Sequence, residues 1–171
     1  MVNASAPLID ATVFMGMHHA DPAVKQQSLA FFGNHFDKTV KMNFAQIGLC
    51  DAVIWKKARA LQDVYYPFMD VLHTDMNIER QGYCQRVLER AAQADELQGL
   101  DAERKLLAAQ VLEYRLPFFT HDPRLTGLAA LQPYLQPFPA LEDPQVFPAA
   151  LQALYQHSTA LVVAAEDLAH V

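Results

Sequence analysis

The sequence has only two cysteines and no hydrophobic run long enough to cross a bilayer. Cys50 and Cys84 lie far apart among the 171 residues and neither belongs to a CxxC pair, so we expect two free, buried thiols in a reducing compartment. Residues 1–7 lack the basic start and long apolar stretch of a secretory signal. These absences predict a cytoplasmic protein with no membrane segment.

Glycine-rich phosphate loops and the HExxH and GxSxG motifs are also missing. The formal net charge of −6 argues against a protein that coats nucleic acid, because such binding depends on many Lys and Arg contacts to phosphate. A short-lived encounter between an enzyme and RNA remains compatible with this charge.

The apolar fraction of 52% predicts a globular protein, and the length predicts one domain over residues 1–171. We expect a helical extension from about 144 to 171 at its end. Apolar runs predict strands and helical spacing predicts helices. The expected strands cover 8–15, 39–42, 116–120 and a short piece near 134–138. The expected helices cover 22–36, 43–94 with breaks near Pro67 and Gly82, and 102–114. This alternation favours an α/β fold in which helices cover a mostly parallel sheet.

Two acidic residues follow apolar strand residues. Asp10 interrupts the first run, and Asp122 ends the run that includes Phe118 and Phe119. The carboxyl ends of parallel strands converge on the ligand crevice, so these carboxylates could meet there and bind Mg²⁺ or Mn²⁺. In the alternative interpretation, Asp10 begins a turn and Asp122 opens an unrelated Asp-Pro turn.

Two segments resemble PIN-domain ribonucleases. Residues 8–14 (LIDATVF) resemble the opening strand of that family, and residues 106–122 are similar to its last helix and strand, ending in a Thr-x-Asp motif at Thr120 and Asp122. The resemblance extends over about residues 8–125. It implies a three-layer α/β/α fold and metal-dependent hydrolysis of RNA to 3′-hydroxyl and 5′-phosphate products. It also implies Asp10 and Asp122 as metal ligands, Thr120 as a supporting residue, and a homodimer.

The sequence departs from the family at two other acids. Where the family has a glutamate on the helix after the second strand, this chain has Gln46, with Asp51 further along. At the third acid the chain has Arg104, with Asp101 and Glu103 within one turn. Asp51, Asp101 and Glu103 are therefore the candidate supporting ligands, and the four-acid site is incomplete.

Histidines offer a different set of metal ligands. His18 and His19 follow the first predicted strand, and Asp70 and His73 have the i,i+3 spacing of one helical face, with Asp75 nearby. If His18, His73 and Asp75 faced the acidic pair, the mixed N/O site would prefer Fe, Mn or Zn to Mg²⁺. In the alternative interpretations the two histidines occupy a loop and the second group is a solvated helix end.

Three functional hypotheses follow. The first is a PIN-like ribonuclease, of which a toxin-type enzyme is one form. The second keeps the fold but uses iron or zinc on a small molecule. The third is a noncatalytic binding subunit with a degenerate pocket and a protein partner. Trp55 and the aromatic residues at 65–68 could stack on bases, but we expect them in the core.

Overall fold

Four short parallel strands lie at the centre of the computed structural model, which describes residues 5–169. The strands are β1 (Leu8–Ile9), β2 (Thr39–Asn43), β3 (Asn77–Gln81) and β4 (Phe118–Phe119). Their order is β3-β2-β1-β4, with Leu8 opposite both Lys41 of β2 and Phe118 of β4. The α/β class and the parallel sheet predicted from the sequence are therefore confirmed.

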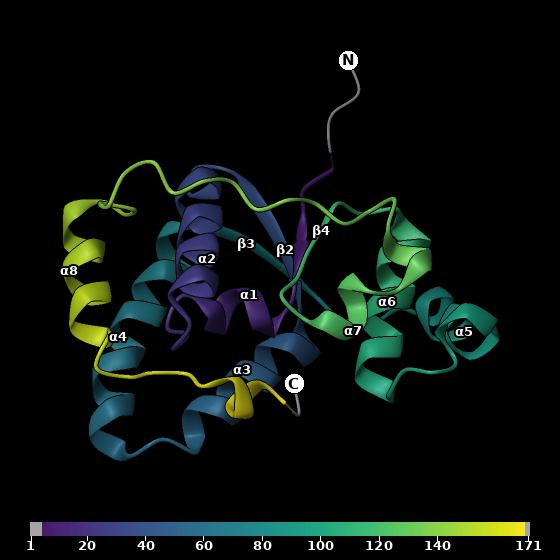
Figure 1. The fold of residues 1–171 in the computed structure, drawn as a ribbon, viewed down its shortest axis with the longest axis horizontal. Helices are drawn as coiled ribbons and strands as arrows, with labels where there is room; N and C mark the ends of the chain where they lie inside the picture. Colours follow the sequence, from purple (N-terminus) through teal and green to yellow (C-terminus); the bar gives the residue numbers. More distant parts are fainter. Residues whose placement is uncertain (1–4, 170–171) are drawn as a thin grey trace.

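Helices cover both faces of this sheet, which gives three layers (Figure 1). The longer helices are α1 (Ala11–Gly16), α2 (Pro22–His35), α3 (Phe44–Trp55), α4 (Arg59–Asp75), α5 (Gln85–Gln93), α6 (Ala102–Tyr114) and α8 (Ala149–Ser158). The short ones are η1 (Asp95–Leu97), α7 (Pro123–Thr126), η2 (Ala129–Leu131) and η3 (Ala165–Leu168). In Figure 1, α2, α4 and α8 lie on one side of the sheet, and α5 and α6 on the other.

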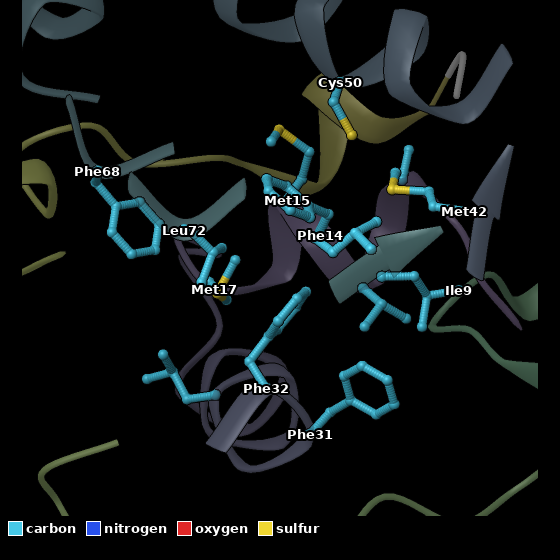
Figure 2. Packing of buried hydrophobic residues seen from close by; sticks show 14 of the residues in the cluster. Ile9, Phe14, Met15, Met17, Phe31, Phe32, Met42, Cys50, Phe68 and Leu72 are labelled. Carbon is cyan, nitrogen blue, oxygen red and sulfur yellow. The ribbon is translucent and has the colours of Figure 1, made fainter. Parts of the chain in front are cut away.

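Neighbouring residues of β1 and of β4 pack into two separate cores. Ile9 and Phe119 belong to the larger cluster, with α1, α2, α4 and α8, whereas Leu8 and Phe118 belong to the cluster under α5 and α6. Successive side chains of a strand point to opposite faces, so even two-residue strands contribute to both cores. Figure 2 shows the larger core, in which Phe14 and Phe32 meet edge to face with ring centroids 5.5 Å apart.

The first strand is shorter than predicted. The chain leaves β1 after Ile9 and enters α1 at Ala11, so the predicted strand over 8–15 is wrong beyond Ile9. Asp10 is the reason, because its carboxylate accepts from the backbone N–H groups of Thr12 and Val13 and caps the helix. All six residues of α1 are buried, so the segment shows no amphipathic period that would distinguish a helix from a strand.

A close approach fixes one residue of α1. A Cβ on Gly16 would lie 2.1 Å from Ser28 Oγ, so any other residue here would force Ser28 or α2 to move.

Helix caps locate the other early helices well. Asp21 caps α2, Asn43 caps α3 and Asp101 caps α6, each through its side-chain oxygen. The predicted helices 22–36 and 102–114 are confirmed to within one residue. In both segments the cap residue directly precedes the helix.

The prediction for 43–94 was wrong at Pro67, whereas the predicted break near Gly82 is present and longer than expected. The first break lies at 56–58, α4 continues through Pro67, and β3 occupies Asn77–Gln81. The strand was missed because it is a polar edge strand in which only Ile78 is buried.

The predicted strand near 134–138 is reduced to an isolated bridge between Phe118 and Leu135, because Pro133 and Pro137 flank it and cannot donate hydrogen bonds. The helical extension divides into α8 and η3. Its last two residues, like residues 1–4, lie outside the described part of the chain. Within residues 5–169, no helix is both long and apolar enough to span a membrane.

Candidate functional site at the carboxyl ends of the strands

Asp10 lies at the carboxyl end of β1 and is 2% exposed. Its Oδ1 accepts hydrogen bonds from Thr12 Oγ1 at 2.5 Å, Thr12 N at 3.0 Å and Val13 N at 3.2 Å. Its Oδ2 accepts from Thr120 Oγ1 at 2.5 Å. Both carboxylate oxygens are therefore already hydrogen-bonded.

Thr120 connects the two acids. Its hydroxyl donates to Asp10 and accepts from the backbone N–H of Asp122 at 2.9 Å, so the ends of β1 and β4 are joined. Asp122 is 5% exposed and caps α7 through Oδ1, which accepts from Arg124 N at 3.0 Å. The prediction that Asp10 and Asp122 lie at neighbouring strand ends is consistent with this arrangement. Each also serves as a helix cap.

Arg104 donates a hydrogen bond to the second carboxylate oxygen of Asp122. Its Nε donates to Asp122 Oδ2 at 2.5 Å, and its Nη1 donates to Asp101 Oδ2 at 2.7 Å. The arginine is 9% exposed, so a cationic side chain is fixed beside the acidic pair. Charge-assisted hydrogen bonds of this kind are among the strongest in proteins.

Gln46 closes the other side of the site. Its Oε1 accepts from Ala11 N at 2.9 Å, and its own N–H donates to the cap residue Asn43 at 2.8 Å. Asn43 in turn donates to Gln110 and Tyr83. Neutral amides and a phenol therefore surround the carboxyl end of β2, where the PIN family would have a glutamate.

Burial raises the pKa of Asp10 to about 6, and the charge of Asp122 adds to this rise while hydrogen bonds from Thr12 and Thr120 oppose it. Burial and a neighbouring carboxylate both disfavour the charged form of a carboxyl group. Asp10 can thus be partly protonated near neutral pH.

The other candidate acids have different surroundings. Asp51 faces a small cavity between α3 and α4 with Cys50 and His73. Asp101 is engaged by Arg104, and Glu103 is exposed on the first turn of α6.

His18 is enclosed by aromatic rings from Tyr65, Phe68 and Tyr155, with centroid distances of 5.2, 5.6 and 5.3 Å. Its Nε2 lies 2.7 Å from Ser158 Oγ, whose proton is donated to the carbonyl of Tyr155. Ser158 therefore accepts from His18, and among residues 5–169 the buried Nδ1 has no hydrogen-bond partner. Burial lowers the pKa of His18 to about 3, so it is neutral.

The second histidine group lies elsewhere. His73 stacks on Phe14 with centroids 5.3 Å apart and pairs with Arg80 at 2.7 Å, while Asp75 is exposed at the end of α4. The structure therefore gives His18, His73 and Asp75 separate environments. Over residues 5–169, no group of three or more His, Cys, Asp or Glu side chains is arranged to hold a metal ion.

Two expectations about burial were wrong. Cys50 is buried and Cys84 is exposed, although both are free thiols as predicted. Trp55 is 73% exposed on α3, whereas Tyr65 and Phe68 are in the core as expected.

Several residues of the site were missed. Thr12 Oγ1 accepts from His121 N at 2.9 Å in addition to its bond to Asp10, and this hydroxyl two residues after a capping Asp was a usable signal. Arg124, two residues after Asp122, lines a cavity over the site together with His19. Nothing in the sequence indicated that the C-terminal η3 would also reach this cavity.

Together these features define an α/β protein with a polar site at the carboxyl ends of a parallel sheet, where such folds bind ligands. The chain belongs to the family of unknown function DUF6190, which it matches over residues 1–168. No curated protein matches its sequence.

Proposed function

We propose that this chain is a noncatalytic binding protein with a PIN-like frame, in which an arginine ion pair occupies the place of the catalytic metal. The ion pair between Arg104 and Asp122 carries this proposal. A divalent cation near Asp122 would be repelled by the buried guanidinium and would have to displace it.

The hydrogen bonds of the two acids support the same conclusion. Asp10 receives four donors, and Asp122 receives Arg124 N and Arg104 Nε. Mg²⁺ requires nearly regular octahedral oxygen ligation. Ligation by either acid would require breaking contacts that also cap α1 and α7.

A cytoplasmic location and self-association are further parts of the proposal. Two unpaired cysteines fit a reducing compartment. Phe44 and Trp55, 58% and 73% exposed on α3, fit a surface that pairs with a second copy or another protein. Sedimentation of the wild type and of Trp55→Ala would measure this self-association.

The ribonuclease remains a second candidate, because Asp10 and Asp122 lie on adjacent strands and are linked through Thr120. It would need Mg²⁺ or Mn²⁺ between the two carboxylates and would release a 5′-phosphate.

One experiment separates the two proposals. Purified protein is incubated with single-stranded and structured RNA in Mg²⁺ and in Mn²⁺, beside Asp10→Asn, and Mn²⁺ binding is titrated by calorimetry. The binding-protein proposal expects no Asp10-dependent cleavage and a dissociation constant for Mn²⁺ in the millimolar range or weaker. Cleavage that Asp10→Asn abolishes would establish the ribonuclease, and elemental analysis showing stoichiometric iron or zinc would contradict both.

A further inference from the structure

A cavity of about 340 Å³ lies over the carboxyl ends of β1 and β4 and beneath η3. Four separate parts of the chain contribute to it: the segment from Thr12 of α1 to Val24 of α2, Arg104 of α6, the turn after β4, and η3 with Ala169. The volume is that of a small-molecule site, at the lower end of the usual range.

The charged lining of this cavity is predominantly cationic. Arg104 and Arg124 line it together with one acid, Asp122, whose oxygens accept from Arg104 Nε and Arg124 N. Asp101, outside the lining, pairs with both arginines. The chain as a whole carries a net charge of −6, so this cationic lining is a local feature.

Arg124 is the arginine most available to a ligand. Its side chain is 64% exposed, and its ion pair with Asp101 has a separation of 3.6 Å, beyond hydrogen-bond distance. The planar N–H donors of a guanidinium match the oxygens of a carboxylate or phosphate.

The two histidines add polar ring nitrogens to the wall. His19 Nδ1 accepts from Asp21 N at 2.9 Å, which leaves the ring proton on Nε2 as a donor. His121 is hydrogen-bonded to Ser28 and stacked on Phe138, with ring centroids 4.3 Å apart, so the position of its ring is fixed.

The rest of the wall is apolar. Val24, Pro123, Ala165, Leu168 and Ala169 supply carbon surface from both sides of the cavity. The helix η3 is held in place, because Asp167 accepts from Lys57 Nζ at 2.7 Å and from Ala164 N at 2.8 Å. An anionic head and an apolar body would each find a complementary wall.

We propose that this cavity binds a small organic oxyanion, a carboxylate or a phosphate monoester, with its head at Arg124 and its apolar body against η3. The inference rests on the proposed function, since it assigns a ligand to a site in which an arginine has replaced an acid. Relative to the PIN pattern, the preferred ligand charge at this end of the sheet has thus changed from positive to negative.

Calorimetry with three probes that share a phenyl ring tests the head group. Benzoate and phenyl phosphate carry the two oxyanions, and benzamide is the neutral counterpart of benzoate. We expect at least one anion to bind at least tenfold more tightly than benzamide. Binding of only one anion identifies the head group, and binding of both identifies a site for either.

Variants of the full chain test the location. Arg124→Gln is expected to weaken anion binding at least tenfold, whereas Arg115→Gln, an exposed arginine at the end of α6, leaves it unchanged. Ala165→Trp should fill the cavity and abolish binding, with Ala153→Trp on the exposed surface of α8 as its control.

Three results would overturn the inference: no anion binds, benzamide binds as well as the tighter-binding anion, or Arg124→Gln retains wild-type affinity. The proposed function fails on a different result, Asp10-dependent RNA cleavage. The two failures are therefore distinguishable in the same preparation.

Discussion

Arg104 Nε lies 2.5 Å from Asp122 Oδ2, and both side chains are almost completely removed from solvent. Burying two charges carries a large desolvation cost, which their attraction offsets only while both partners remain. The pair therefore makes each residue depend on the other, whatever the protein binds.

Removing one partner of this pair should destabilise the fold strongly. We expect Arg104→Ala to lower the free energy of unfolding by about 3–5 kcal/mol, because Asp122 is left as a buried, uncompensated charge. The double variant Arg104→Ala/Asp122→Asn should lose less than the sum of the two single variants. Urea unfolding of the four proteins measures the coupling, and strictly additive losses would contradict it.

Restoring acids at the two divergent positions should create a metal site. Gln46→Glu/Arg104→Asp would place four acids at the strand ends, and we expect its Mn²⁺ affinity to exceed that of the wild type at least tenfold. Gln46→Glu alone keeps the arginine and serves as the matched control. Titration calorimetry measures the affinity, and equal affinities for control and double variant would show that Arg104 does not exclude the cation.

His18 should make the free energy of unfolding decrease as the pH is lowered. Its folded pKa of about 3 lies below the ordinary 6.5, so between these values the unfolded chain binds a proton that the folded chain does not. The contribution of His18 to stability is therefore complete above pH 6.5 and lost as pH falls toward 3, by up to ~1.4 kcal/mol per pH unit.

His18→Phe tests this pH dependence because it keeps an aromatic ring within the cage of Tyr65, Phe68 and Tyr155. Urea midpoints between pH 4 and 7.5 should decline less steeply with acid than those of the wild type. A wild-type slope retained in His18→Phe would assign the proton uptake to other groups.

Two glycines should respond to alanine in opposite directions. Gly16→Ala places a methyl group 2.1 Å from Ser28 Oγ, and we expect a loss of about 1–3 kcal/mol from overpacking. Gly48→Ala, in α3 with open space around it, should gain about 0.5–1 kcal/mol from helix propensity. Thermal unfolding compares the two, and a neutral Gly16→Ala would mean that α1 and α2 can separate without cost.

The sequence predicted those parts of the fold that have local signals. Asp21, Asn43 and Asp101 mark helix starts because each side chain bonds to a backbone N–H within three residues. The exit from β1 was missed because α1 is buried on every side, and β3 because only Ile78 among its residues is buried.

The candidate site divides in the same way. Asp10 and Asp122 could be placed because they end apolar runs that become neighbouring strands. The bond from Arg104 to Asp122 and the approach of η3 depend on how α6 and the C-terminal segment pack, and sequence spacing contains no measure of either. The isolation of His18 in an aromatic cage depends on α8, about 140 residues further along the chain.

The hydrogen bond from Thr120 to Asp10 joins residues 110 positions apart. During translation the first strand and its acid leave the ribosome long before β4 and Thr120 are synthesised. Until then Asp10 lacks one of its donors, and the central strand has β2 as its only neighbour in the sheet. Completion of the sheet is therefore a late event, and chains that stop before residue 118 should be substrates for chaperones and proteases rather than folded intermediates.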